Sequence, residues 1–133
     1  MTQIKAYTDL EQSKKLAEIL PLESANMHYN NASIKGINYV DEHRAELMEY
    51  NRAIEVLSKY TINPLFEVIP CWSLTVLIDV LPRIDIEKET WSDDTYDYRV
   101  KVYIDDGYVG DWFDNPIDAC YDMIITLNKD KLL

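Results

Sequence analysis

The chain has 133 residues, of which 47% are hydrophobic, so it is long enough to bury one core and too apolar for a disordered protein. No apolar stretch approaches the roughly 20 residues of a membrane span, and the first residues lack the apolar core of a secretory signal. The net charge of −11 argues against direct binding to nucleic acid or to an acidic membrane, since both are negatively charged. We therefore expect a single domain over residues 1–133 that stays in the cytoplasm.

A helix and a strand are predicted at the start of the chain. The helix is expected over residues 9–20, because Thr8 and Glu11 have the spacing of a capping box and Pro21 follows the apolar positions. A short strand is expected over residues 25–30.

A long second helix is predicted after a polar loop over residues 31–39. It begins at Asp41 and runs to about Lys59, and Pro64 prevents its continuation. Its apolar positions repeat at spacings of three and four, which favours a narrow stripe that packs on a sheet or on another helix. The same stripe is our candidate for a homodimer contact, and its residues are Val40, Leu47, Tyr50, Ile54 and Leu57.

The centre of the chain predicts a strand followed by a third helix. Residues 65–69 are rich in strand-forming side chains, and Pro70 closes that run. Ser73 is a suitable cap for the helix, which ends at the next proline. The two cysteines, Cys71 and Cys120, lie in apolar surroundings, and we expect both to be buried free thiols because a reducing cytoplasm disfavours disulfides.

The last third of the chain predicts a β-meander and a final helix. The three strands are expected over residues 84–91, 96–104 and 108–113. Asp106 and Gly107 mark the turn between the last two strands, because glycine accepts the positive φ that such turns require. Asn115 then caps the helix, with Pro116 in its first turn.

These elements predict an α+β fold. We expect an antiparallel or mixed sheet of about four to five strands that includes the C-terminal meander. About four helices pack on it in an α-β-α sandwich-like arrangement. The segment 31–64 is expected to be a helical insertion in the single domain.

Several kinds of chemistry have no residues to carry them. With only three glycines in the chain, neither a GxGxxG motif nor a P-loop can be written. His28 and His43 lack metal-ligand spacing, and nothing near them resembles a nucleophile elbow. We therefore assign no catalytic, cofactor-binding or metal-binding residue. A carboxylate-metal enzyme stays an alternative, with hard cations held by clusters that comprise Asp93, Asp94 and Asp97, and Asp105, Asp106, Asp111 and Asp114.

Acidic and aromatic residues concentrate in one segment. Between Asp85 and Asp118 the chain has 11 acidic and 3 basic residues, and aromatic rings cluster around the predicted hairpin. Trp and Tyr among carboxylates are typical of a protein–protein contact, and an acidic surface suits a basic partner. We therefore predict a non-enzymatic protein that binds or inhibits a protein partner, through Trp91, Asp93, Asp94, Tyr103, Asp105, Asp106 and Tyr108. An alternative is a protein that binds or sequesters a nucleotide, with Arg99 or Lys101 at the phosphate and an aromatic ring on the base.

Three blocks of the sequence resemble a known group of proteins. They comprise residues 9–25 (DLEQSKKLAEILPLESA), residues 69–74 (IPCWSL) with 80–82 (VLP), and residues 114–125 (DNPIDACYDMII). In this order they resemble small uncharacterised proteins of gut Bacteroidales and their phages or mobile elements, and the pattern is similar to phage-encoded α-β-α sandwich domains. The resemblance implies a phage or mobile-element accessory protein in the cytoplasm of a bacterial host cell, and it supplies no catalytic residue. The long charged helix expected between Asn30 and Leu65 departs from it.

Overall fold

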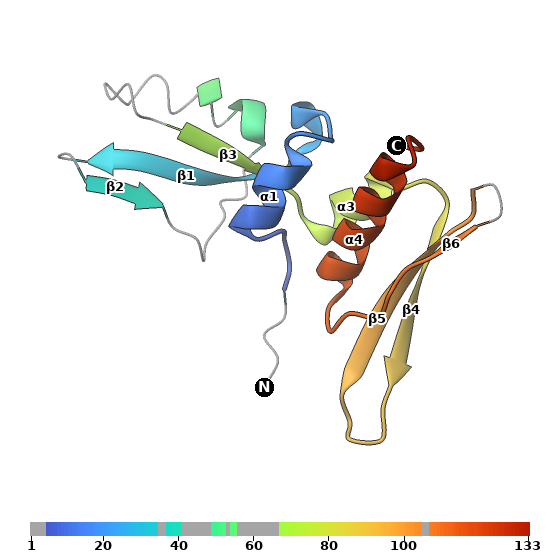
Figure 1. The fold of residues 1–133 in the computed structure, drawn as a ribbon. Helices are drawn as coiled ribbons and strands as arrows, with labels where there is room; N and C mark the ends of the chain where they lie inside the picture. The colour runs from blue at the N-terminus through green and yellow to red at the C-terminus, as the bar shows by residue number, and fades with distance from the viewer. Residues whose placement is uncertain (1–4, 35–36, 41–48, 53, 56–66, 105–106) are drawn as a thin grey trace. The chain divides into compact units, whose positions relative to one another are not determined.

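The computed structural model describes the chain in six segments and divides it into two compact units (Figure 1). The described residues are 5–34, 37–40, 49–52, 54–55, 67–104 and 107–133. The N-terminal unit comprises Tyr7–Ser73, and the C-terminal unit comprises Leu74–Leu133 together with Met1–Ala6. Within the described segments, no helix has the length and apolar character needed to cross a membrane.

The N-terminal unit is built on a three-stranded antiparallel sheet. Its elements are α1 (Leu10–Leu16), the 3-10 helix η1 (Leu22–Ser24), β1 (Met27–Ile34), β2 (Ile37–Val40) and β3 (Glu67–Cys71). The strand order is β2-β1-β3, and α1 packs against β3. Buried side chains of the two strands β1 and β3 form the core of this unit, with Tyr7 and Leu10 packed on it. They are Met27, Tyr29, Ile69 and Cys71.

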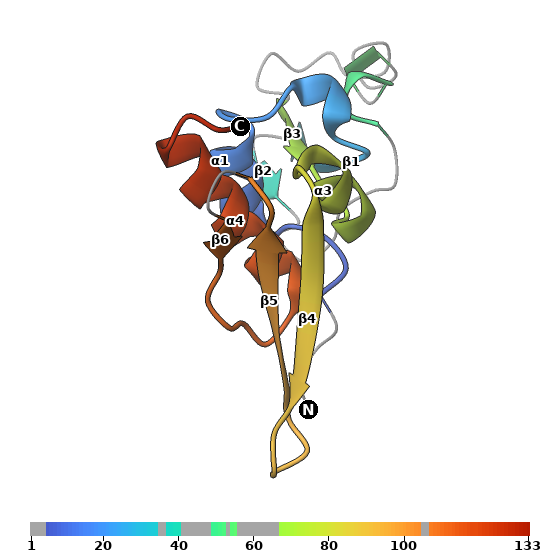
Figure 2. The same ribbon diagram turned by 90° about the vertical axis from the view of Figure 1, so that its right-hand side faces the viewer.

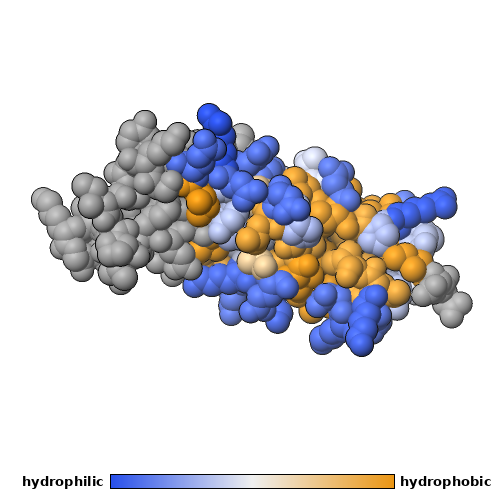
Figure 3. All heavy atoms as spheres, turned by 90° about the horizontal axis from the view of Figure 1, so that it is seen from above, coloured by the Kyte–Doolittle hydropathy of each residue, from blue (hydrophilic) through white to orange (hydrophobic). Residues whose placement is uncertain are grey.

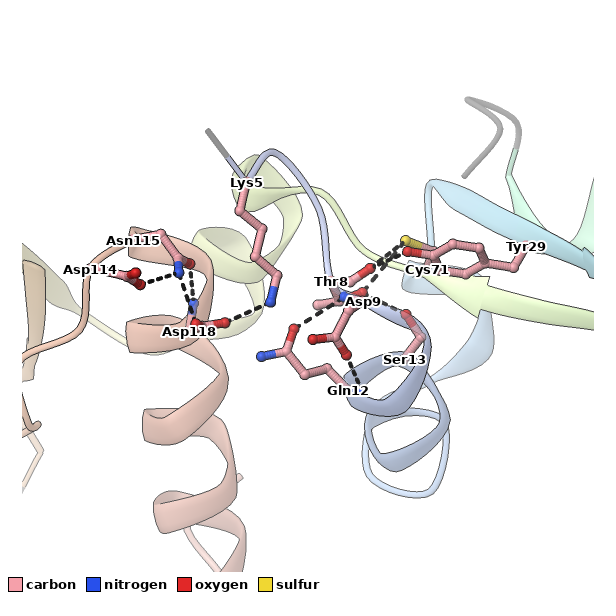
Figure 4. Close-up of polar contacts among 10 residues, drawn as sticks. All are labelled: Lys5, Thr8, Asp9, Gln12, Ser13, Tyr29, Cys71, Asp114, Asn115 and Asp118. Carbon is pink, nitrogen blue, oxygen red and sulfur yellow. Dashed lines mark hydrogen bonds and ion pairs between the residues drawn. The ribbon is translucent and has the colours of Figure 1, made fainter. Parts of the chain in front are cut away.

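A buried polar network joins the start of α1 to β3 (Figure 4). The Thr8 hydroxyl bonds the Ser13 hydroxyl (2.7 Å) and accepts the backbone N–H of Trp72 (3.2 Å). The Tyr29 hydroxyl donates to the carbonyl of Thr8 (2.8 Å), and so does the Cys71 thiol (3.4 Å). All of these polar groups are therefore satisfied by one another, as buried groups must be.

Burial keeps the ionisable groups of Tyr29, Cys71 and Cys120 in their neutral forms. Burial is the main cause that raises the pKa of Tyr29 and of the Cys71 thiol above their ordinary values. Burial also raises the pKa of the Cys120 thiol, to about 12. Both cysteines are buried and free, which confirms the prediction made for them.

The first helix is shorter than predicted and has a different cap. It ends at Leu16, and the residues of its capping box are Asp9 and Gln12. The Asp9 carboxylate accepts the Gln12 N–H (2.8 Å), while the Gln12 side chain accepts the Asp9 N–H (3.1 Å). The prediction that Thr8 caps the helix was wrong, because its hydroxyl is buried in the polar network.

The polar loop predicted over residues 31–39 was also wrong. The strand predicted over 25–30 continues as β1 to Ile34, and β2 returns beside it in the register Ile34↔Ile37 to Asn31↔Val40. Pro70 does not close the third strand but lies inside β3, opposite His28. Proline is tolerated there because β3 is at the edge of the sheet, where a missing N–H costs no ladder bond.

The predicted long helix lies mostly outside the described residues. Within 41–59, residues 50–52 and 54–55 are helical. Tyr50 is half-buried and donates its N–H to the carbonyl of Ala25 (3.2 Å), and Ile54 is exposed. Leu47, Leu57 and the side chain of Val40 lie outside what is described, so the homodimer contact stays a prediction.

The C-terminal unit is a second antiparallel sheet with two helices on one of its faces (Figure 1). Its elements are α3 (Leu74–Val80), β4 (Ile84–Thr90), β5 (Tyr96–Val102), β6 (Tyr108–Val109) and α4 (Pro116–Lys129), and the strand order is β4-β5-β6. Val100 and Val102 of β5 are buried under α4. The buried side of α4 comprises Ile117, Ala119, Cys120, Met123, Ile124 and Leu127.

The start of α4 is fixed by a chain of polar contacts (Figure 4). The Asn115 side chain accepts the Asp118 N–H (2.8 Å) and donates to the Asp118 carboxylate (2.8 Å), with Pro116 in the first turn as predicted. Lys5 completes the chain with an ion pair to Asp118 (2.8 Å). The segment just before α4 runs beside β5, where Phe113 forms an antiparallel bridge with Tyr98.

The α+β class and the antiparallel C-terminal meander are confirmed. The strands are divided between two sheets of three, because β1 pairs with both β2 and β3, whereas β5 pairs with both β4 and β6. Gly107 has the positive φ (86°) that was expected of the turn before β6. The expectation of one domain over residues 1–133, with a helical insertion at 31–64, stays a prediction, although 31–34 and 37–40 are strand.

Candidate functional site

The β4–β5 hairpin has one covered face and one open face. Side chains of a strand alternate between the two faces. Val100 and Val102 are buried under α4, so the alternate residues of β5 and their partners on β4 point to the opposite side. We call that side the outer face. Its strand residues are Asp85, Glu87, Glu89, Asp97, Arg99 and Lys101, and Trp91, Tyr103 and Trp112 extend it.

One acidic and two basic side chains form ion pairs in the middle of the outer face. Glu87 accepts a hydrogen bond from Arg99 Nε (2.6 Å) and forms an ion pair with Lys101 Nζ (2.6 Å). The contact with Lys101, followed by that with Arg99, holds the pKa of the Glu87 carboxyl below its ordinary value. Both basic groups are thus engaged with an acid in the same sheet.

Replacing Glu87 with Gln is expected to destabilise the protein at neutral pH and to have little effect in acid. A lowered pKa means that the ionised form stabilises the fold above the ordinary value of 4.5, and that this stabilisation is lost as the pH falls through the lowered pKa. Urea unfolding of the wild type and Glu87→Gln at pH 7 and pH 3 measures this difference. Glu89→Gln is the matched control, since among the described residues Glu89 has no ion pair. An equal effect of Glu87→Gln at both pH values contradicts the assignment.

Two tryptophans lie together at one end of the outer face. The Trp91 Nε1–H donates to the Asp97 carboxylate (2.8 Å), and the ring meets that of Trp112 edge to face with centroids 6.1 Å apart. The Arg99 guanidinium lies over the Trp112 ring, 4.5 Å from its centroid. Trp91 is nevertheless 42% exposed. The exposed ring is therefore held in one orientation by its neighbours.

The hairpin tip beside Trp91 is a tight turn that extends past the start of α4 (Figure 2). The Asp93 carboxylate accepts the hydroxyl (2.6 Å) and the N–H (3.3 Å) of Thr95, and the hydroxyl contact is the main cause that lowers the pKa of Asp93. Asp94 is exposed and has a positive φ (63°), a conformation that Asp tolerates in turns. These two acids therefore stabilise the conformation of the turn and also give it negative charge.

Tyrosines mark the other end of the hairpin. The Tyr103 hydroxyl donates to the Asp85 carboxylate (2.7 Å), which raises the pKa of Tyr103, and Arg83 lies over its ring at 6.0 Å. Tyr103 is 53% exposed. The Tyr108 hydroxyl donates to Asp130 at the end of α4 (3.0 Å), so this ring is tied to the helix.

The predicted partner-binding residues thus fall into two groups at opposite ends of one hairpin. Trp91 lies at one end of β4, and Arg83, which contacts the Tyr103 ring, lies at the other end. Eight positions of extended strand separate them, which corresponds to about 26 Å. Trp91, Asp93 and Asp94 lie at the tip, Tyr103 and Tyr108 lie at the other end, and Asp105 and Asp106 are outside the described residues.

The predicted partner-binding set omitted several other residues of the outer face, namely Asp85, Glu87, Asp97, Arg99, Lys101 and Trp112. Asp97 was named only in the metal-site alternative, and Arg99 and Lys101 only in the nucleotide alternative. The alternation of polar residues along β5 was the available signal for three of them. Nothing comparable marks Trp112, whose place depends on the bridge between Tyr98 and Phe113 that brings its segment alongside β5.

The outer face combines exposed aromatic rings with charged side chains that form ion pairs. Within the described parts of the chain, no three His, Cys, Asp or Glu residues are grouped to hold a metal ion. Hydrophobic and hydrophilic side chains both reach the surface seen in Figure 3, and the exposed apolar residues of the meander include Val109 (63%). Comparisons of the chain with models of protein families, with curated proteins and with solved structures each found no match.

Proposed function

We propose that this chain is a non-enzymatic accessory protein of a phage or mobile element that binds, and thereby inhibits, a protein partner in the cytoplasm of a bacterial host. The contact surface is the outer face of the β4–β5 hairpin. The observation that carries this proposal is the exposed Trp91 ring, which is fixed by Asp97 and Trp112 before any partner arrives.

Fixed aromatic rings favour binding because ordering a side chain costs free energy. A mobile interface side chain loses about 0.5–1.5 kcal/mol of conformational freedom on association. Trp91 loses less, since it is already held on two sides, and tryptophan is among the residues that contribute most at protein interfaces. The exposed Tyr103 ring, bonded to Asp85, offers a second anchor at the other end of the same face.

Charge determines which partner this face suits. The chain carries a net charge of −11, so its field attracts a basic protein and speeds association at low salt. Near the centre of the outer face, however, Arg99 and Lys101 are already paired with Glu87. A partner that contacts the centre of the outer face therefore meets side chains that are already paired. The long-range attraction for a basic partner comes from the surrounding acidic residues.

The nucleotide-binding alternative has less support from the same contacts. It requires Arg99 or Lys101 to meet a phosphate, and both are engaged by Glu87 at 2.6 Å. The carboxylate-metal alternative requires several acids to converge. Asp93 is instead bonded to Thr95, and Asp97 to Trp91.

Affinity capture tests the proposal with two baits. The wild-type chain and the Trp112→Ala variant are each immobilised, exposed to lysate of a Bacteroidales host and eluted with a salt gradient. We expect the wild type to retain one basic protein until moderate salt, and the variant not to enrich it. The reason is that the variant lacks the Trp112 ring that contacts Trp91 and Arg99. Identical recovery from both baits, or no enrichment by the wild type, contradicts the proposal.

A further inference from the structure

We infer that β4 is a docking edge that accepts an extended strand of the partner, with basic residues at alternate positions and β-branched residues between them. This inference rests on the proposed function, because it specifies how the partner of the outer face is held. It follows from the direction of the backbone groups of β4 and from the charges that flank them.

One side of β4 has no strand beside it among the described residues, since the sheet order begins at β4 and continues to β5. The ladder to β5 is in register from Ile84↔Val102 to Thr90↔Tyr96. Two backbone bonds at its ends set the phase of that ladder. The Tyr103 N–H donates to the carbonyl of Arg83 (3.0 Å), and the Trp91 N–H donates to the carbonyl of Thr95 (2.9 Å).

In an antiparallel pair, only alternate residues exchange backbone hydrogen bonds with the neighbouring strand. Because Arg83 and Trp91 are bonded across the hairpin, so are Asp85, Glu87 and Glu89 between them. The intervening residues direct their N–H and C=O groups away from β5. These residues are Ile84, Ile86, Lys88 and Thr90, and together they form an open row of donors and acceptors.

The side chains of β4 determine which strand fits this edge. Every outer-face residue of the strand is acidic, namely Asp85, Glu87 and Glu89. On an incoming antiparallel strand, the residues opposite these acids occupy non-hydrogen-bonded pairs, where side chains approach most closely, at about 4.5 Å between Cα atoms. Lysine or arginine at those positions of the incoming strand would face the acids of β4 from the open side, as Arg99 and Lys101 face Glu87 from β5.

The same row disfavours a second copy of the chain as the occupant. Two β4 strands whose outer faces coincide would bring acid against acid, and like charges opposite one another destabilise a sheet. On the covered side of the sheet, Ile86 is 36% exposed at this edge and can pack against an apolar side chain of the incoming strand. The edge thus suits an amphipathic basic strand.

A synthetic peptide tests this inference without the natural partner. The probe has lysine at alternate positions with valine or threonine between them and blocked ends, and the control peptide has the same composition with its lysines contiguous. We expect the alternating peptide to bind several-fold more tightly. In hydrogen-exchange NMR, the amides of Ile86 and Lys88 should become protected on binding, whereas the amide of Glu87 is protected already. Equal affinity for the two peptides, or unchanged exchange at Ile86 and Lys88 at saturation, overturns the inference.

A proline at position 88 separates backbone pairing from simple charge attraction. Lys88→Pro removes an N–H that points away from β5, so the β4–β5 ladder stays intact, whereas Lys88→Thr removes the same side chain and keeps the N–H. We expect Lys88→Pro to weaken binding of the alternating peptide about tenfold relative to Lys88→Thr, from the lost hydrogen bond and the clash of the ring. An equal effect of both substitutions contradicts docking at the edge.

The two proposals can fail separately. If the natural partner depends on Trp91 but neither the peptide nor Lys88→Pro shows an effect, the edge inference fails and the proposed function stands. If the peptide docks on β4 but no partner depends on the outer face, the proposed function fails instead.

Discussion

Replacing Trp91 with Ala is expected to weaken binding of the purified partner by about 30-fold or more, which corresponds to roughly 2 kcal/mol. The change removes the exposed ring, its edge-to-face contact with Trp112 and the hydrogen bond to Asp97. Titration calorimetry or surface binding at fixed salt measures the loss. Thermal unfolding should change little, because the ring lies at the exposed tip of the hairpin.

Two further variants show whether position and orientation of the ring matter. Tyr96 is 47% exposed near the same end of the hairpin but belongs to the opposite row of β5, so Tyr96→Ala is a matched control. We expect Tyr96→Ala to leave the affinity within about threefold. Trp91→Phe keeps an aromatic ring without the bond to Asp97 and should lie between the wild type and Trp91→Ala. Equal losses for Trp91→Ala and Tyr96→Ala contradict a specific role for the outer face.

Replacing Trp72 with Ala is expected to cost about 3–5 kcal/mol of the free energy of unfolding, the range for truncating a buried large aromatic residue. Trp72 is fully buried, and its indole N–H donates to the Ser24 hydroxyl (2.9 Å). The truncation leaves a cavity and removes a hydrogen-bond donor. Since a domain has only about 5–15 kcal/mol of stability in total, the loss is a large fraction of it.

Chemical denaturation followed by near-ultraviolet circular dichroism measures this loss. Leu22→Ala is the matched control in the same unit, because Leu22 is 38% exposed and its truncation should cost well under about 1 kcal/mol. A cost below about 1 kcal/mol for Trp72→Ala would show that the site collapses around the smaller side chain, against the packing described for the N-terminal unit.

The parts of the fold that could be predicted are those specified by local sequence. Asn115 and Pro116 announce the start of α4 by residue type alone, and the strict alternation from Tyr96 to Val102 specifies β5 and its two faces. β2 was missed because Asn31–Tyr39 is polar and short, so its strand character comes from pairing with β1. The one local signal for a hairpin was Gly36, a residue typical of turns, with an isoleucine shortly before it and another directly after it.

The candidate site was harder to predict because its geometry depends on contacts across the sheet. Asp93 and Asp94 were predicted as part of one surface with Tyr103, yet the length of β4 separates them. The pairing of Glu87 with Arg99 follows from the register of β4 and β5, which no single strand specifies. Trp112 lies on the outer face because the bridge between Tyr98 and Phe113 holds its segment beside β5.

Oxidative footprinting of the complex tests the central claim most directly. Hydroxyl radicals modify exposed aromatic side chains, and the free protein presents Trp91 and Tyr103 on the outer face and Tyr96 on the opposite row. We predict that the partner protects Trp91 and Tyr103 and leaves Tyr96 as reactive as in the free protein. Unchanged modification of Trp91 and Tyr103 in a saturated complex would contradict the account, because the partner would then bind elsewhere.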